Sequence, residues 1–161
     1  MRIQTSRFGN FEVDDKDPIH FPQGMIGFPE EKQFVLLRHR DDSAIGWLQS
    51  TTNAGLAFPV VSIDALAVVY PTIAASPLPG TPSQEADPHA VMAVLCASSG
   101  QPATVNLLAP IVVNVRSRKG AQILLEGTTF STNEPFVLRN LPPIAAEQGP
   151  EQKAAAAAPT P

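Results

Sequence analysis

The sequence predicts an all-β protein: a single antiparallel, β-barrel-like domain with short strands over residues 1–141, followed by a disordered C-terminal tail over residues 142–161. Two observations predict it. The chain has 17 prolines among 161 residues, and an interior proline removes a helical hydrogen bond and clashes with the preceding turn. Between the prolines lie short runs rich in Val, Ile, Leu and Phe, which have strand length and are bounded by turn residues.

These runs define the expected strands in chain order: 45–50, 57–63, 91–97, 111–116 and 121–126. Segment 76–90, SPLPGTPSQEADPHA, has no periodicity and predicts a long exposed loop. The tail is rich in Pro, Ala and Gln and has a single large apolar residue, Ile144. Such a segment cannot bury enough apolar surface to offset the entropy lost on ordering, so it is expected to be disordered.

The last two expected strands flank the basic turn SRKG and should form a hairpin. If Ser117 pairs with Gly120, both faces of the ribbon mix apolar and polar side chains. If Ser117 pairs with Ala121, Val113 lies on an apolar face and Asn114 on a more polar one. Burial favours the second register, because a slip of one residue exchanges the two faces. Gly120 would then be a bulge residue with positive φ, which glycine adopts without steric penalty.

Composition and charge exclude several classes of protein. The formal net charge is -4 and the isoelectric point is about 5.3, which argues against a nucleic-acid surface and permits a basic protein partner. No apolar run reaches the ~18 residues of a membrane span, and the start, MRIQTSRFGNFEV, lacks the apolar stretch of a signal peptide. The single cysteine agrees with a reducing compartment, so we expect a cytoplasmic protein. As to its oligomeric state, we favour a monomer.

No group of residues predicts catalysis, a metal site or a cofactor. Cys96 ends an apolar run and is expected to be a buried small hydrophobe. His20, His39 and His89 share no metal-ligand spacing. The segment GMIG at 24–27 is expected to be a turn, because no G-K-[ST] follows it. We therefore expect a protein that is not an enzyme.

Several segments together resemble one family. TVNLLAPIVVN at 104–114 is followed by a basic turn and GAQILL, and upstream lie IHFPQGMIGFPE at 19–30, FVLLRH at 34–39, WLQS at 47–50 and AFPVVSI at 57–63. In this order they resemble the signature of the flagellar assembly factor family FliW, over about residues 2–130. No single segment is specific; the order and the 104–114 run carry the resemblance.

The resemblance implies a fold and a function. FliW-like proteins are antiparallel β-barrel-like domains without catalytic activity or cofactor. They bind flagellin and alternatively bind CsrA, a translational repressor, and this antagonises the binding of CsrA to RNA. Flagellin translation then follows the level of free flagellin. The alternative is a generic β-barrel nucleic-acid or ligand-binding module, which would bind RNA in a strongly salt-dependent way. The family resemblance predicts neither direct nucleic-acid binding nor a membrane.

Candidate partner contacts follow from the family motifs and from the acidic pairs. Acidic side chains suit a basic, RNA-binding partner, and the LQS motif contributes two polar residues. For the acidic pairs the alternative is a solvated loop, and for Gln49 and Ser50 it is stabilisation of a turn. The predicted partner-binding residues are Gly27, Phe28, Glu30, Glu31, Asp41, Asp42, Gln49 and Ser50.

Overall fold

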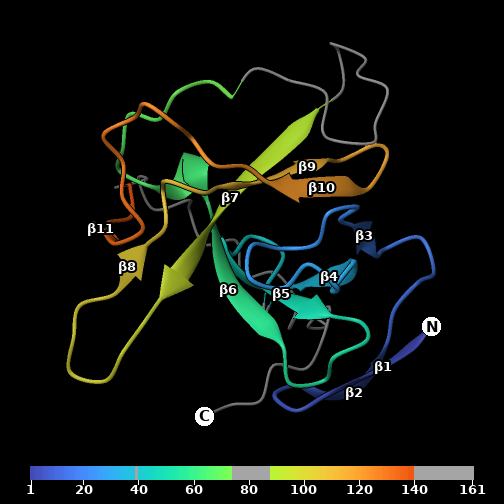
Figure 1. The fold of residues 1–161 in the computed structure, drawn as a ribbon. Helices are drawn as coiled ribbons and strands as arrows, with labels where there is room; N and C mark the ends of the chain where they lie inside the picture. Colours follow the sequence, from blue (N-terminus) through green and yellow to red (C-terminus); the bar gives the residue numbers. More distant parts are fainter. Residues whose placement is uncertain (39, 74–87, 140–161) are drawn as a thin grey trace.

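The computed structural model describes residues 1–38, 40–73 and 88–139 (Figure 1). No α-helix occurs in this part of the chain, and one 3-10 helix, η1 (Ile63–Ala65), follows the sixth strand. The strands are β1 (Arg2–Thr5), β2 (Gly9–Glu12), β3 (Ile19–His20), β4 (Gln33–Leu37), β5 (Ile45–Ser50), β6 (Ala57–Ser62), β7 (His89–Cys96), β8 (Thr104–Val105), β9 (Ile111–Asn114), β10 (Lys119–Gln122) and β11 (Glu134–Pro135).

Seven of these strands close into a barrel. Hydrogen-bonded neighbours follow the order β7–β6–β5–β4–β3–β10–β9, and β9 pairs with β7 to complete the ring. A ring with an odd number of strands cannot alternate direction throughout, so one joint must be parallel. That joint lies between β3 and β10, where the backbone N–H of His20 donates to the carbonyl of Arg118 at 2.8 Å. The predicted antiparallel β-barrel class is confirmed, with this one parallel joint.

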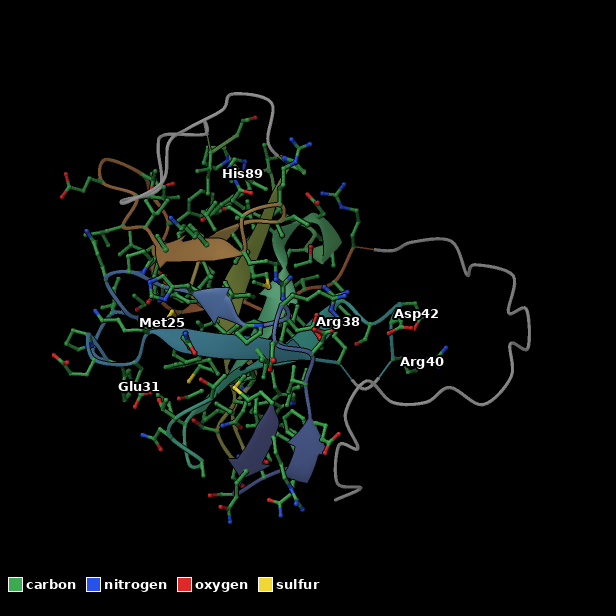
Figure 2. The ribbon with its side chains drawn as sticks, turned by 90° about the vertical axis from the view of Figure 1, so that its right-hand side faces the viewer. Met25, Glu31, Arg38, Arg40, Asp42 and His89 are labelled. Atoms are coloured by element: carbon green, nitrogen blue, oxygen red, sulfur yellow. The ribbon has the colours of Figure 1, made fainter. Side chains whose placement is uncertain are left out.

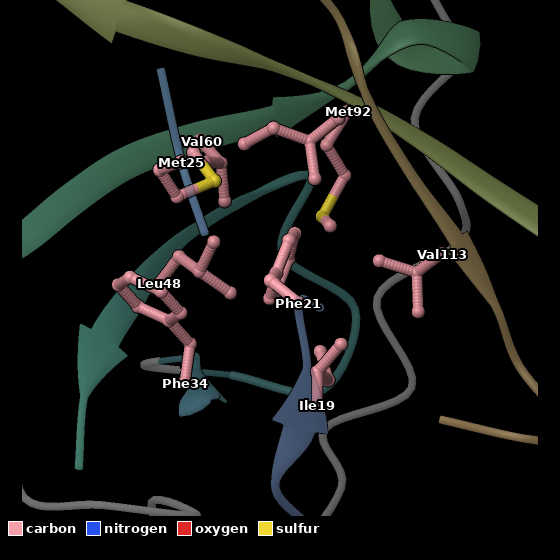
Figure 3. Packing of buried hydrophobic residues seen from close by; sticks show 9 residues of the cluster. Ile19, Phe21, Met25, Phe34, Leu48, Val60, Met92 and Val113 are labelled. Carbon is pink, nitrogen blue, oxygen red and sulfur yellow. The ribbon is translucent and has the colours of Figure 1, made fainter. Parts of the chain in front are cut away.

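One apolar cluster, here called the interior cluster, packs inside the barrel (Figure 3). Its side chains come from β3 to β7, from β9, and from the loop after β3, and they point toward one another around the ring of Phe21. The members are Ile19, Phe21, Met25, Phe34, Leu48, Val60, Met92, Ile111 and Val113.

The outer surface of the barrel is also covered. The β1–β2 hairpin packs Ile3 and Phe8 against Val35 and Leu37 of β4. The segment that includes η1 packs Leu66 with residues of β6 and β7 in a second outer cluster. Because strands with two buried faces carry apolar side chains at successive positions, β4 reads FVLL instead of alternating between apolar and polar residues.

The strands expected at 45–50, 57–63 and 91–97 correspond to β5, β6 and β7. β7 starts earlier than expected, so His89 and Ala90 belong to a strand and not to the predicted loop. Most of that loop, at 74–87, and the predicted tail lie outside the described residues, and the tail remains a prediction. Cys96 was expected to be buried but is exposed, because it is the last residue of β7 and follows Met92 and Val94 on the face of the interior cluster, past the end of that cluster.

The predicted hairpin register is wrong. Gly120 pairs with Val113 and Lys119 with Asn114, so the turn comprises residues 115–118. Gly120 does not have positive φ; Arg118 does, at 57°. Asn114 is buried, and its Oδ1 accepts the backbone N–H groups of Arg116 and Ser117 at 3.0 and 2.9 Å, which holds the turn.

The physical reason for this error is burial on both faces. Ile111 and Val113 point into the interior cluster, whereas Val112 packs outside with Ala121 and Ile123. The predicted register requires one solvated face, and β9 has none. With both faces buried, apolar alternation cannot select the register, and the side-chain cap from Asn114 decides where the turn begins.

Candidate partner-binding surface

One end of the barrel carries a tight turn that presents two apolar side chains. Met25 and Phe28 form an antiparallel bridge, with N–H···O distances of 3.2 and 2.8 Å, and Gly27 between them has φ of 86°. Met25 is 2% exposed and anchors the turn in the interior cluster. Ile26 and Phe28 are 58% and 39% exposed. We call residues 24–31 the end loop.

The ring of Phe28 is supported although it is exposed. It packs edge-on against Phe58 with a centroid separation of 5.4 Å. Phe58 in turn packs against Phe34 at 6.0 Å, and Phe34 against the buried Phe21 at 5.4 Å. A row of four rings therefore connects the end loop to the centre of the barrel, and each contact favours one ring orientation.

Two further contacts tie the end loop to the rest of the barrel. The backbone N–H of Ile26 donates to Oε1 of Gln122 in β10 at 3.0 Å, and Nε2 of Gln122 donates to the carbonyl of Ala109 at 3.1 Å. Both ends of this side-chain amide are thus occupied. The position of the turn depends on β10 as well as on Met25.

The carboxylate of Glu31 joins the end loop to the β5–β6 turn. It accepts hydrogen bonds from Ser50 Oγ at 2.7 Å, Thr52 Oγ1 at 2.9 Å and Asn53 Nδ2 at 3.2 Å. These bonds, the one from Ser50 first, lower the pKa of Glu31 below its ordinary value against a smaller opposing effect of burial. Glu31 is therefore a structural brace, while the neighbouring Glu30 is exposed to solvent.

Gln49 and Ser50 hold the β5–β6 turn from inside. Both are 0% exposed. Nε2 of Gln49 donates to the carbonyls of Ser50, Asn53 and Leu56 at 3.0, 3.2 and 3.0 Å, and Ser50 Oγ accepts the backbone N–H of Asn53 at 2.9 Å. A direct partner contact through either side chain would require the turn to open. Their arrangement matches the turn-stabilising alternative.

Asp41 and Asp42 lie at the opposite end of the barrel, as Figure 2 shows for Asp42 relative to Glu31. Both are exposed, and Asp42 forms an ion pair with Arg40 at 3.2 Å. β4 and β5 run from one end of the barrel toward the other: Phe34 pairs with Ser50 beside the end loop, and Leu37 pairs with Trp47 toward the end that carries the two aspartates. The predicted residues thus form two groups: six at the end loop and its supporting turn, and two aspartates at the other end.

The residues predicted from the sequence do not include Ile26, Phe58 or Gln122. Ile26 lies inside the GMIG turn, where an apolar residue is typical of core, and only the alternation of Met25 inward and Ile26 outward reveals its exposure. The contact of Gln122 with Ile26 joins residues 96 positions apart and leaves no local signal. Within residues 1–38, 40–73 and 88–139, no group of three or more His, Cys, Asp or Glu side chains could hold a metal ion, and no helix there is long and apolar enough to cross a membrane.

The fold and this surface define a small closed β-barrel with an apolar and acidic loop at one end, supported from the barrel interior. Comparison with known proteins identifies the family: the family model described as "FliW protein" matches residues 2–136. The chain belongs to the FliW family, whose curated members are flagellar assembly factors.

Individual relatives agree over most of their length. The flagellar assembly factor FliW of Desulfitobacterium hafniense (strain DSM 10664 / DCB-2) is 38% identical over 133 residues, which cover 81% of this chain and 88% of that protein. The one from Geobacter sulfurreducens is 37% identical over 138 residues, covering 84% and 86%. A crystal structure of the flagellar assembly factor FliW superposes with a TM-score of 0.68 at 32% identity, covering 84% of this chain and 96% of that one.

Proposed function

We propose that the protein binds flagellin and, alternatively, CsrA, and that its binding to CsrA antagonises the binding of CsrA to RNA. Flagellin synthesis would then follow the amount of free flagellin in the cytoplasm, without a catalytic step. Membership of the FliW family supports the choice of partners. The segments 19–30 and 104–114 resemble the motifs of that family, and the resemblance implies flagellin and CsrA as partners. The end loop supports the choice of surface.

The observation that carries the choice of surface is the exposure of Ile26 and Phe28 on a braced turn. Large apolar side chains in solvent gain most when a partner covers them, and aromatic residues are enriched among the contacts that dominate binding energy. Because Phe58 and Met25 already hold the turn, little conformational freedom remains to be lost on binding. A rigid apolar anchor of this kind suits a protein partner.

Charge supports a basic partner. A protein that binds RNA carries a positive surface, and Glu30 presents an exposed carboxylate beside the apolar pair. Asp41 and Asp42 lie at the far end of the barrel and can act on the same partner only through the long-range field, which steers encounter and weakens with salt. Glu31 contributes by holding the loop.

The test is co-elution in size-exclusion chromatography of the purified protein with the CsrA and, separately, the flagellin of the same organism. We expect a complex with each, and displacement of one partner by the other. Phe28→Ala should weaken binding by roughly tenfold or more, as for a dominant aromatic contact. The matched control is Val137→Ala, which truncates a side chain that is 54% exposed outside the end loop and should leave affinity unchanged.

Each other outcome has a definite meaning. A complex with flagellin alone would remove the translational arm of the proposal. Equal weakening by Phe28→Ala and Val137→Ala would reject the end loop as the contact surface. Binding to neither protein, with RNA retained at low salt and released steeply as salt rises, would replace the proposal with the nucleic-acid module.

A further inference from the structure

The end of the barrel opposite the end loop is hollow. A cavity of about 180 Å³ opens there between the starts of β5 and β7 and the end of β4. Its walls inside the barrel are the apolar side chains of Ile19, Leu36, Val60, Met92 and Val113. Four of these belong to the interior cluster (Figure 3), so the cavity is the part of the barrel interior that the interior cluster leaves unfilled.

Two arginines stand at this cavity. Arg38 and Arg118 both line it, and Figure 2 shows Arg38 on the side of the molecule away from Met25 and Glu31. The guanidinium of Arg38 donates to the backbone carbonyl of Asp41 at 3.4 Å. Arg118 donates through Nη2 to the carbonyl of Asp17. Neither arginine forms an ion pair with a carboxylate of the described residues.

Arg118 is held there by the backbone. Its φ of 57° places it in the left-handed region, and its N–H and carbonyl are bonded to Asn114 and His20 at 3.0 and 2.8 Å. Its side-chain Nε is buried and has no hydrogen-bond partner among the described residues. A buried donor without a partner is destabilising, so an acceptor that reaches this group from the cavity would be stabilised by it.

We propose that this cavity binds a small monocarboxylate with a compact apolar body, such as an aromatic or branched-chain acid. The apolar body would lie among Val60, Met92 and Val113, and the carboxylate would accept hydrogen bonds from Arg38 and Arg118. The volume fits: an apolar cavity of roughly 150 Å³ holds a benzene molecule. Planar guanidinium groups match the geometry of a carboxylate.

A neighbouring hollow restricts the charge of the ligand. Arg38 and Arg118 also line an outer cavity of about 280 Å³ whose walls include Glu12, Asp17 and Asp41. These acidic residues share the outer cavity with the two arginines and would repel a second negative charge on the ligand. The site should therefore prefer a monoanion to a dicarboxylate. It lies apart from the end loop, so this inference does not depend on the proposed function.

The test uses the full chain, with benzoate as the probe, and follows the methyl signals of Met92 and Val113 by NMR. Benzoate should shift both signals saturably. Benzamide has the same shape without the charge and should bind at least about tenfold more weakly, as should benzoate to Arg38→Gln. Acetate, which has the charge without the apolar body, should not shift the signals. Arg2→Gln is the control, since Arg2 is exposed on β1 and does not line the cavity.

A second variant keeps the test decisive if Arg38→Gln folds poorly. Ala90 is exposed on β7 and lines the cavity mouth, so Ala90→Phe should close the entrance and abolish the benzoate shifts while the protein remains folded. The proposal is overturned if benzoate causes no saturable shift, if benzamide binds as tightly, or if Ala90→Phe leaves binding unchanged.

Discussion

Gly120→Ala tests how tightly the barrel interior is packed. Gly120 lies in β10 opposite Val113 and lacks positive φ, so its backbone conformation is open to alanine. A Cβ added there would lie 2.8 Å from Cε1 and Cζ of Phe21 and 3.3 Å from Cγ2 of Ile19. Carbon atoms in contact prefer about 3.5–4.0 Å. The Phe21 ring, which is 0% exposed, would therefore have to move by roughly 0.7–1.2 Å to reach that separation.

The expected cost follows from overpacking. Adding one carbon at a position that is already closely packed, as Gly120 is against Phe21, destabilises by about 1–3 kcal/mol. With a urea m-value of about 1.5 kcal/mol/M, the unfolding midpoint should fall by roughly 0.7–2 M. The fluorescence of Trp47, the single tryptophan, reports the transition. Gly55→Ala is the control, because Gly55 is exposed and lacks positive φ, and a Cβ added there would meet only Asn53 Oδ1 at 3.6 Å. The free energy of unfolding of this variant should stay within about 0.5 kcal/mol of the native value.

A double-mutant cycle identifies the cause. Phe21→Leu shortens the side chain that the added methyl group would strike, so the double variant should be more stable than the sum of the two single effects by at least about 0.5 kcal/mol. Backbone strain at Gly120 would not depend on Phe21. Strictly additive effects, or an unchanged midpoint for Gly120→Ala, would refute the packing argument.

Three further predictions concern side chains outside the interior. Glu31→Gln should lower the free energy of unfolding at neutral pH by about 1 kcal/mol. Because the folded pKa of Glu31 is depressed, the stability that its carboxylate contributes is present above the ordinary pKa of 4.5 and is lost as pH falls. The urea midpoints of the variant and the native protein should therefore converge in acid, and a constant difference between the midpoints would contradict this. Burial raises the pKa of Tyr70 to about 12 from 10.0, so ultraviolet titration of this single tyrosine should show ionisation near the higher value. Native stability should decline as pH rises from 10 toward 12, and Tyr70→Phe should lack this decline. A titration midpoint near 10 would contradict the effect of burial on this phenol. Asn114→Ala removes the acceptor for two backbone N–H groups and should lower the free energy of unfolding, measured with heat or urea, by about 1–2 kcal/mol. Asn114→Asp keeps that acceptor and should lower it by less. Equal losses of stability in the two variants would show that the side-chain oxygen does not hold the turn.

Much of the barrel could be predicted because its signals are local. Prolines exclude long helices wherever the chain is placed, and the runs that became β5, β6 and β7 have strand length and composition. The turn at Gly27 was also predictable, since glycine readily takes the positive φ of 86° found there. The order of the family segments then indicated the class of protein.

The candidate surface was predictable only in part. The segment that forms the end loop was selected by its motif, and the structure shows Phe28 and Glu30 exposed there. Gln49 carries an equally suggestive motif but is fully buried, because the β5–β6 turn closes over it and accepts its amide hydrogen bonds. Polar residue type alone does not distinguish a contact from an internal brace.

The sequence by itself determined the all-β class, the positions of the long strands and the family to which the chain belongs. Only the tertiary structure decided the register of β9 against β10, the grouping of Glu31 with Ser50 and the space left between Met92 and Arg38. The physical reason is that local signals record propensity and periodicity over a few residues. Register in a strand buried on both faces, and the pairing of side chains from distant segments, depend on what the closed barrel brings against them.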